Sequence, residues 1–266
     1  MPSRWTVSTP ERRISLKSPN PHELKAYLRD ICLPALLREA PYFSIKDIKS
    51  FLGSQAVPFN ERTLVRYLHE FVASSHIHNA GRGWYSSLEM PFELDSSTVQ
   101  ELAGELAKAF PLVGFSCWST AEIQGAMHHL LGKFVSFVMV EGDSMEPFYE
   151  HLRDSGWDAH INPRGKEAAR FSPREHSVVI RKASAKSRAR GPIAPIENLL
   201  VELYFETRVL GLMAVDDYRT MLSSLAGTRR INMASLLTYA TERKLEPGAL
   251  FGKDSQLFPP NNFRRK

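Results

Sequence analysis

Cysteine is scarce in this 266-residue sequence, which contains only Cys32 and Cys117. The two residues belong to different predicted elements, and no metal-binding spacing surrounds either of them. We therefore expect no metal site and no bound cofactor. Two such isolated thiols also indicate a reduced, cytoplasmic setting.

Long apolar segments are missing as well. The longest run, residues 134–140, has the length of a buried strand and falls far below the roughly 20 residues of a membrane span. The first residues of the chain lack the apolar core of a signal peptide. We expect a globular protein without a membrane segment or a signal peptide, as 43% hydrophobic and 24% charged residues also indicate.

Positive charge is concentrated in two separate regions, within a net charge of +5. Residues 1–90 contain 12 Lys and Arg and 8 Asp and Glu, which gives 12 − 8 = +4. Residues 163–192 contain 9 basic and 2 acidic residues, which gives 9 − 2 = +7. This distribution favours a polyanionic partner, although a solvated face and a basic loop would produce the same composition.

The elements predicted for residues 22–90 follow the order of a winged helix, three helices and then a hairpin. Apolar spacing, capping residues and glycines mark each one. They are a helix over 22–40 kinked at Pro34, a helix over 45–52 with Ser44 as its N-cap and Gly53 as its stop, a helix over 60–72 capped by Asn60, and a hairpin over 77–85 that turns at Gly81 and Gly83.

The third helix and the hairpin are the candidate DNA-binding surface. A recognition helix directs long polar side chains at base edges while neighbouring groups contact phosphates, and an arginine can bind guanine with two hydrogen bonds. The candidate residues are Asn60, Arg62, Arg66, His69, Asn79 and Arg82. Glu61 and Glu70 weaken the positive field of this surface. A winged helix used for protein contacts remains the alternative.

Residues 96–250 alternate helices with strands and then become helical, which predicts a mixed α/β (α+β) domain with a partly parallel sheet. The expected helices cover 97–110, a segment that starts at Ser119, 145–154, 196–207, 216–225 and 232–244, and the expected strands cover 112–117, 134–140, 157–161 and 176–182. Residues 1–20 and 252–266 are expected to be flexible tails.

Two kinds of enzyme are weighed against this interpretation. Ser144 and Lys182 have the order of the serine–lysine pair of self-cleaving phage repressors, with Ala103-Gly104 as a cleavage site. A helix after Ser144 and a helical setting for residues 103–104 argue against that chemistry. Glu141 and Asp143 follow a split Gly-Ser motif at Gly114 and Ser116, but the spacing does not match that of a nucleotidyltransferase.

Several segments in the second half are shared, in the same order, with a bacterial family. They are residues 134–141, the helix from Met145, Gly156-Trp157, the turn at 161–163, residues 178–181 and the helix start at 195–201. On these segments the chain resembles AbiEi-type antitoxins and transcriptional regulators, over about residues 22–250. The resemblance implies an N-terminal winged helix followed by a nucleotidyltransferase-like α/β domain without the catalytic carboxylates. It also implies an antitoxin that represses its own operon through double-stranded DNA and counteracts a nucleotidyltransferase-like toxin.

A basic run departs from the pattern of that family. It consists of Arg181, Lys182, Lys186, Arg188 and Arg190. This secondary basic patch would bind nucleic acid, such as the RNA substrate of a toxin, or would be a disordered loop between strands.

Overall fold

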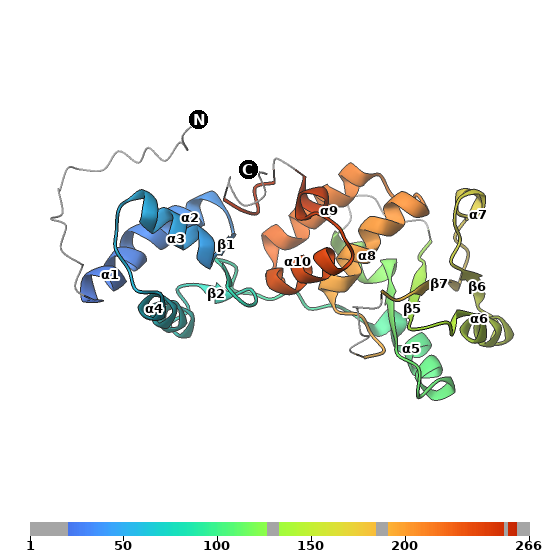
Figure 1. Cartoon of the computed structure of the whole chain (residues 1–266). Helices are drawn as coiled ribbons and strands as arrows, with labels where there is room; N and C mark the ends of the chain where they lie inside the picture. Colours follow the sequence, from blue (N-terminus) through green and yellow to red (C-terminus); the bar gives the residue numbers. More distant parts are fainter. Residues whose placement is uncertain (1–20, 127–132, 185–190, 253–254, 260–266) are drawn as a thin grey trace.

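The computed structural model describes residues 21–126, 133–184, 191–252 and 255–259. Its N-terminal part follows the order helix, strand, helix, helix, strand, strand (Figure 1). The first helical stretch is continuous, and the strands form an antiparallel sheet in the order β1-β3-β2. The bounds are α1 Pro21–Tyr27, η1 Leu28–Cys32, α2 Leu33–Glu39, β1 Tyr42–Ser44, α3 Ile45–Ser54, α4 Glu61–Ala73, β2 His78–Asn79 and β3 Trp84–Ser86.

The interruption expected near Pro34 takes the form of a widened helical turn. Leu33 donates its backbone N–H to the carbonyl of Leu28, five residues earlier, instead of the usual four. Pro34 follows this turn at the second residue of α2, and the widened turn accommodates the N–H that proline lacks. The helix therefore continues through the proline.

Ser44 begins α3 as its sequence predicts. Its hydroxyl accepts the Asp47 N–H at 3.3 Å, and the Asp47 carboxylate accepts the Ser44 N–H at 2.6 Å. The helix continues past Gly53 to Ser54, two residues beyond its predicted end at residue 52. Strand β1 was not predicted, because three residues are too short to show a period and β1 depends on pairing with β3.

The C-terminal part contains a sheet of strand order β4-β5-β7-β6, in which β4 is antiparallel to β5 and the other neighbours are parallel. The bounds are α5 Ser97–Ala109, β4 Phe115–Ser119, η2 Thr120–Ala126, β5 Ser136–Val140, α6 Met145–Asp154, β6 Asp158–Ile161, α7 Lys166–Arg170, β7 Ser177–Lys182, α8 Ile196–Val209, α9 Val215–Thr228, α10 Met233–Glu242 and α11 Pro247–Phe251.

Successive side chains of the central strands point to opposite faces, as strand geometry requires. On β5, Phe137 and Met139 join the core formed with α8 to α11, whereas Val138 and Val140 join a second core with α5 and α6. The sheet is therefore the middle layer between two groups of helices (Figure 1). A third core lies within the N-terminal part.

The mixed α/β composition and the partly parallel sheet agree with the sequence prediction. Helix α6 has the predicted bounds, and β5, β6, β7 and α8 differ by a few residues. The segment after Ser119 differs more, since a tight 3₁₀ helix over Thr120–Ala126 replaces the expected α-helix up to residue 126. Residues 127–132, where that helix was expected to continue, lie outside the described residues.

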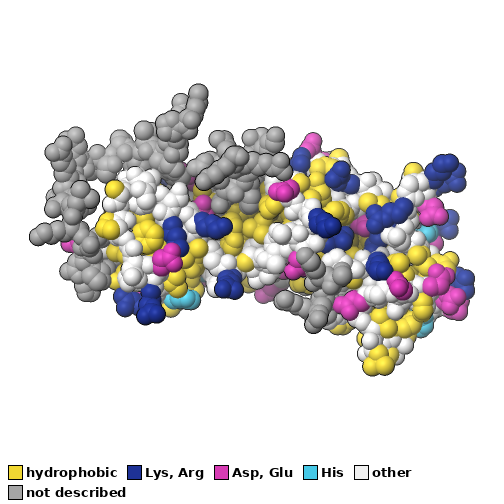
Figure 2. Space-filling view, viewed as in Figure 1, with side chains coloured by type: hydrophobic (Ala, Val, Ile, Leu, Met, Phe, Trp, Pro, Cys, Tyr) yellow, Lys and Arg dark blue, Asp and Glu magenta, His cyan; other side chains and the backbone are white. Residues whose placement is uncertain are grey.

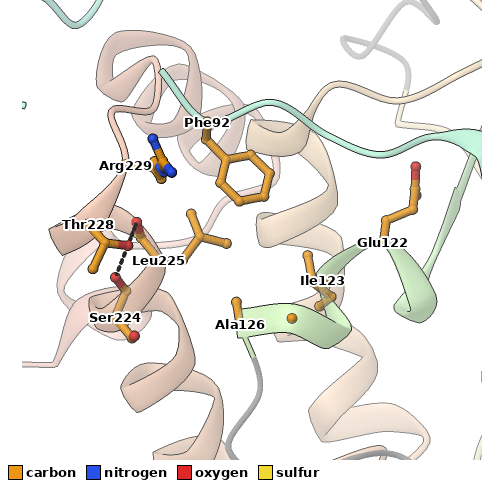
Figure 3. A pocket seen from close by; sticks show the side chains of 9 residues that line it. Phe92, Glu122, Ile123, Ala126, Ser224, Leu225, Thr228 and Arg229 are labelled. Atoms are coloured by element: carbon orange, nitrogen blue, oxygen red, sulfur yellow. Dashed lines mark hydrogen bonds between the residues drawn. The ribbon is translucent and has the colours of Figure 1, made fainter. Parts of the chain in front are cut away.

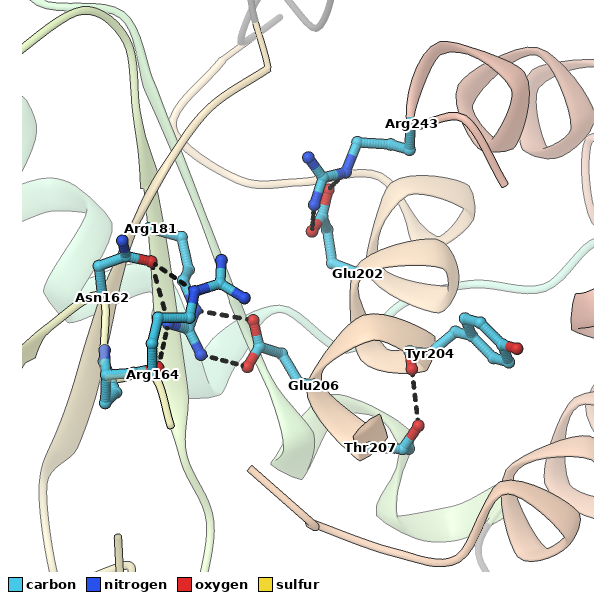
Figure 4. A network of polar contacts seen from close by, with 9 residues as sticks. Asn162, Arg164, Arg181, Glu202, Tyr204, Glu206, Thr207 and Arg243 are labelled. Carbon is cyan, nitrogen blue, oxygen red and sulfur yellow. Dashed lines mark hydrogen bonds and ion pairs between the residues drawn. The ribbon is translucent and has the colours of Figure 1, made fainter. Parts of the chain in front are cut away.

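Helix α8 carries buried carboxylates that connect it to its neighbours (Figure 4). Glu206 accepts two hydrogen bonds from Arg181 on β7, at 2.8 and 2.6 Å. Glu202 pairs with Arg243 after α10 and accepts the Tyr239 hydroxyl. Glu197 accepts the backbone N–H of Asn232 at 2.8 Å, where α10 begins. Buried charges are tolerated only when paired in this way, so these contacts fix the position of α8.

The N-terminal part packs against the C-terminal helices through Tyr42. Its hydroxyl donates to the Arg229 carbonyl at 3.1 Å and accepts the Ile231 N–H at 3.0 Å. The Arg230 guanidinium donates to the carbonyls of Leu88 and Glu89 in the connecting segment. These contacts join segments more than 140 residues apart in the chain.

The expected flexible tail from residue 252 is wrong for residues 255–259. Leu257 and Phe258 are buried, and the Leu257 carbonyl accepts the Tyr42 N–H at 3.2 Å. The Phe258 ring contacts the rings of Tyr42 and Trp84. These two large apolar side chains are buried between the two parts of the molecule. The local sequence does not show this contact, because the residues that bury them are distant in the chain.

In the part of the chain that the structure describes, we find no helix with the length and apolar character of a membrane span.

The Arg181–Glu206 pair provides a test of what holds the sheet to α8. We expect Arg181→Met to lower the free energy of unfolding by about 3–5 kcal/mol, because it leaves a buried carboxylate unpaired. Adding Glu206→Leu should recover most of this loss. Urea denaturation measures both.

Lys182→Met is the matched control, since Lys182 forms an exposed ion pair with Asp143. It should leave the midpoint of unfolding unchanged. An equal loss at Arg181 and Lys182, or no recovery in the double variant, would contradict the role given to the buried pair.

Candidate nucleic-acid interface

Helix α4 forms where the sequence predicts it and separates an apolar face from a polar one. The Asn60 side chain accepts the N–H groups of Arg62 and Thr63 at 2.9 and 3.3 Å, which fixes the start of the helix. Leu64, Leu68 and Phe71 are buried in the N-terminal core. The Asn60 side-chain oxygen is thus engaged in capping the helix.

The opposite face of α4 carries an exposed stripe of side chains. Arg62, Val65, Arg66 and His69 occupy positions i, i+3, i+4 and i+7 of one helix face and are all exposed. Among the described residues, the side chains of Arg62 and His69 have no hydrogen-bonding or ionic partner. Their donors are therefore available to an external ligand.

Arg66 is more constrained than Arg62. Its guanidinium lies 5.0 Å from the centre of the Tyr67 ring and 3.7 Å from the Glu70 carboxylate. Glu70 also pairs with Lys25 at 2.6 Å, and this hydrogen bond holds the pKa of Glu70 below its usual value.

The acidic residues of α4 oppose the positive field less than their sequence positions indicate. Glu61 pairs with Lys49 of α3, and Glu70 pairs with Lys25 of α1. Each carboxylate is thus balanced by a cation from a neighbouring helix. Figure 2 shows Lys and Arg side chains gathered at the lower left, over the position of α4, with a histidine beside them.

The β2–β3 hairpin turns through residues 80–83 and is held by its own hydrogen bonds. The Asn79 side chain accepts the Gly81 N–H at 2.7 Å, and the Trp84 N–H donates to the Gly81 carbonyl at 3.0 Å. Asn79 therefore shapes the turn. Arg82 is exposed and has no hydrogen-bonding or ionic partner among the described residues.

The tip of this hairpin contacts α10 and is not open on all sides. Ala80 is buried, and its carbonyl accepts the Ala234 N–H at 3.3 Å. A Cβ atom on Gly81 would lie 2.1 Å from the Asn232 side chain and 2.6 Å from that of Ala234. The missing side chain of Gly81 therefore serves the contact with α10 as well as the turn. Arg82 remains the group on the hairpin that can reach a ligand.

Of the secondary basic patch, the structure describes Arg181 and Lys182, and Arg181 does not lie on the surface. Arg181 is buried and binds Glu206, the Asn162 side chain and the Pro163 carbonyl. The alternation of side chains along β7 turns it toward α8 and leaves Lys182 exposed. Lys186, Arg188 and Arg190 lie outside the described residues.

Lys182 and Ser144 do come to the same edge of the sheet, since Lys182 is paired in register with Val140 on β5. The Lys182 ammonium, however, donates to Asp143 at 2.7 Å and is largely exposed. The hydrogen bond from Lys182 lowers the pKa of Asp143, as expected for a charged pair. A serine–lysine protease needs a desolvated, neutral lysine, which this arrangement does not provide.

Gly114 and Glu141 are neighbours across β4 and β5, with the Glu141 N–H bonded to the Gly114 carbonyl at 2.9 Å. Within the described residues, no group of His, Cys, Asp or Glu side chains has the arrangement of a metal site.

Glu122 is a buried carboxylate that the sequence analysis missed. Its side chain accepts the Ser119 N–H at 2.7 Å, while its other oxygen has no hydrogen-bond partner among the described residues. Burial, together with the nearby charge of Asp95, raises the pKa of Glu122 to about 7. The acidic residue three positions after Ser119 resembles a helix cap in the sequence, so its burial was not evident.

Comparison with known proteins gives one family. The sequence pattern of a family described as a family of unknown function (DUF6577) matches residues 63–248. This range includes most of α4, the hairpin and the C-terminal part as far as α11. No curated protein matches the chain.

The contact between the hairpin and α10 can be tested at two glycines. Gly81 and Gly83 both have positive φ, at 102° and 75°, so alanine is strained at either. At Gly83 an added Cβ would meet its nearest neighbour at 3.7 Å. We expect Gly81→Ala to cost about 1–3 kcal/mol more than Gly83→Ala in thermal or urea unfolding, because it also forces α10 away. Equal losses would show that α10 does not press on the turn.

Glu122 predicts a measurable effect of pH on stability. Its pKa is about 7 in the folded protein, above the ordinary value of 4.5 that we expect for the unfolded chain. The protonated form is favoured by folding, so this contribution is complete below about pH 4.5 and is lost as the pH rises through 7. Glu122→Gln should flatten the decline of stability between pH 5 and 7.5, measured by urea unfolding.

The dependence of stability on pH below pH 4 serves as the internal control. Hydrogen bonds with Ser177 and His160 outweigh burial and lower the pKa of Asp158, so stability should fall below pH 4 in both proteins. An unchanged slope between pH 5 and 7.5 in the Gln variant would contradict the assignment to Glu122.

Proposed function

The chain belongs to DUF6577, a family of unknown function, and we propose that it is a DNA-binding transcriptional regulator that acts in the cytoplasm. The observation that carries this proposal is the exposed stripe of α4, where the side chains of Arg62 and His69 have no partner among the described residues.

The arrangement behind that stripe supports the proposal. A helix, a strand, two helices and a hairpin in the sheet order β1-β3-β2 correspond to the order of a winged helix. In such a domain α4 is the recognition helix, and its buried face holds the exposed stripe in a fixed orientation. Arg62 would contact guanine or phosphate, and Arg66 would contact phosphate from beside Tyr67.

The hairpin has a smaller role in this proposal than in a freely projecting wing. Its tip is held against α10, so only the Arg82 side chain extends toward a duplex. We assign Arg82 to a single phosphate contact beside the groove that α4 occupies.

The resemblance to AbiEi-type regulators extends the proposal to a biological role. In that role the protein is the antitoxin of a phage-defence system that represses its own operon, and its nucleotidyltransferase-like C-terminal part counteracts a nucleotidyltransferase-like toxin or protects the RNA on which that toxin acts. A neighbouring gene for such an enzyme, whose toxicity is relieved by co-expression of this chain, would support the role. If no such gene is adjacent, or if its product is not toxic, the protein would be a regulator without a toxin.

Fluorescence anisotropy with labelled duplex DNA from upstream of the gene tests the DNA-binding proposal. We expect Arg62→Ala with Arg66→Ala to weaken binding by a factor on the order of 10². The slope of log affinity against log salt should become shallower by about 0.9 for each phosphate contact that is lost. Arg82→Ala alone should produce a smaller change.

The control is Lys166→Ala with Arg170→Ala, which removes the same charge from exposed positions on α7. It should leave the affinity nearly unchanged. Equal loss in the α4 and α7 variants would mean that net charge alone attracts DNA, and unchanged binding in the α4 variant would refute the proposed interface.

A further inference from the structure

Two ion pairs join α4 to the helices that precede it in the chain. Glu61, at the start of α4, pairs with Lys49 of α3, and neither side chain forms a hydrogen bond or ion pair with an arginine of the exposed stripe among the described residues. Glu70, near the end of α4, pairs with Lys25 of α1 at 2.6 Å and also lies 3.7 Å from the guanidinium of Arg66. Of the two pairs, the second therefore shares its carboxylate with an arginine of that stripe.

The two oxygens of the Glu70 carboxylate face different cations. Oε2 lies 2.6 Å from the Lys25 ammonium, which is a hydrogen-bonding distance, whereas Oε1 lies 3.7 Å from Arg66 Nε, which is too long for a hydrogen bond. The attraction between opposite charges grows as they approach each other. Lys25 therefore holds this carboxylate more strongly than Arg66 does.

Arg66 is also held by its neighbour Tyr67. The tyrosine is 5% exposed, and the Arg66 guanidinium lies 5.0 Å from the centre of its ring and donates from Nη2 to its hydroxyl at 3.3 Å. Because the ring is buried, it gives the guanidinium a fixed support on the surface of α4. The Nη1 group of Arg66 has no hydrogen-bonding partner among the described residues and is available to a ligand.

From this arrangement we propose that Lys25 is a positioning residue for DNA binding, because it holds Glu70 and so leaves Arg66 available to a phosphate. Arg66 and Glu70 are four residues apart on one helix, a spacing at which opposite charges pair. An arginine and a carboxylate can form two parallel hydrogen bonds, as an arginine and a phosphate can. Without Lys25, the carboxylate would therefore compete with a phosphate for the same donors of Arg66. The proposal rests on the assignment of α4 as the helix that contacts DNA.

Lys25→Met in the full-length chain tests this role, with Lys49→Met as the matched control. Each change removes one lysine and leaves one α4 carboxylate without its partner, so the net charge falls equally. Fluorescence anisotropy with the upstream duplex measures both. We expect Lys25→Met to weaken binding on the order of tenfold, because a phosphate contact of Arg66 is lost as well. Lys49→Met should weaken it by about two- to threefold, the effect of an exposed charge alone.

Two second-site changes separate the positioning role from a structural one. Glu70→Gln, added to Lys25→Met, removes the competing carboxylate and should restore the affinity to nearly that of the unmodified chain. In the background of Arg66→Ala, Lys25→Met should weaken binding no more than Lys49→Met does, because the arginine on which Lys25 acts is absent. If Lys25 only stabilised the fold of α1 against α4, its larger effect would persist in that background.

The outcomes distinguish this proposal from the DNA-binding proposal on which it rests. If the unmodified chain binds the duplex but the Lys25 and Lys49 variants lose affinity equally, the role of Lys25 is overturned and the α4 interface stands. The same holds if Glu70→Gln fails to restore the affinity of Lys25→Met. If the unmodified chain binds no duplex, the α4 interface itself is refuted, and the role of Lys25 with it.

Discussion

The three carboxylates buried on α8 are the constraint on which the remaining structure depends. Glu206 binds Arg181 and ties the helix to the sheet, and Glu202 binds Arg243 and Tyr239 and ties it to α10. Glu197 accepts the Asn232 N–H at the start of α10. The β2–β3 hairpin packs against the start of α10. A continuous series of contacts therefore connects the sheet, through α8 and α10, to the N-terminal part. Each carboxylate would be costly without its partner, which makes the positions of these elements mutually dependent.

This dependence gives α4 a fixed orientation relative to the C-terminal part. Tyr42, Arg230 and Phe258 add contacts at the same junction, with the connecting segment held beside them. A DNA duplex on α4 would therefore meet one defined face of the protein. A pocket lined by Phe92, Ile123, Leu225 and Arg229 (Figure 3) adjoins this junction, because Arg229 also supplies the carbonyl that accepts the Tyr42 hydroxyl.

Much of the candidate interface was predictable, because it depends on local physics. Asn60 and Ser44 are caps by virtue of side chains that reach backbone N–H groups a few residues away. The exposed stripe of α4 follows from the helical period and the apolar residues opposite. Arg181 illustrates the limit. A run of basic residues is typical of a surface patch. Arg181 nevertheless lies in the interior, because the side chains of β7 alternate between its two faces and because Glu206, 25 residues later, pairs with it.

The sequence by itself determined most of the longer elements, their order and the mixed α/β class, because apolar periodicity, caps and turn residues act over a few positions. Only the tertiary structure decided that Gly81 serves α10 and that Leu257 and Phe258 are buried. Each of these depends on contacts between residues more than 100 positions apart. Such contacts leave no period in a single sequence, since the free energy that selects them comes from burial and pairing in the assembled fold.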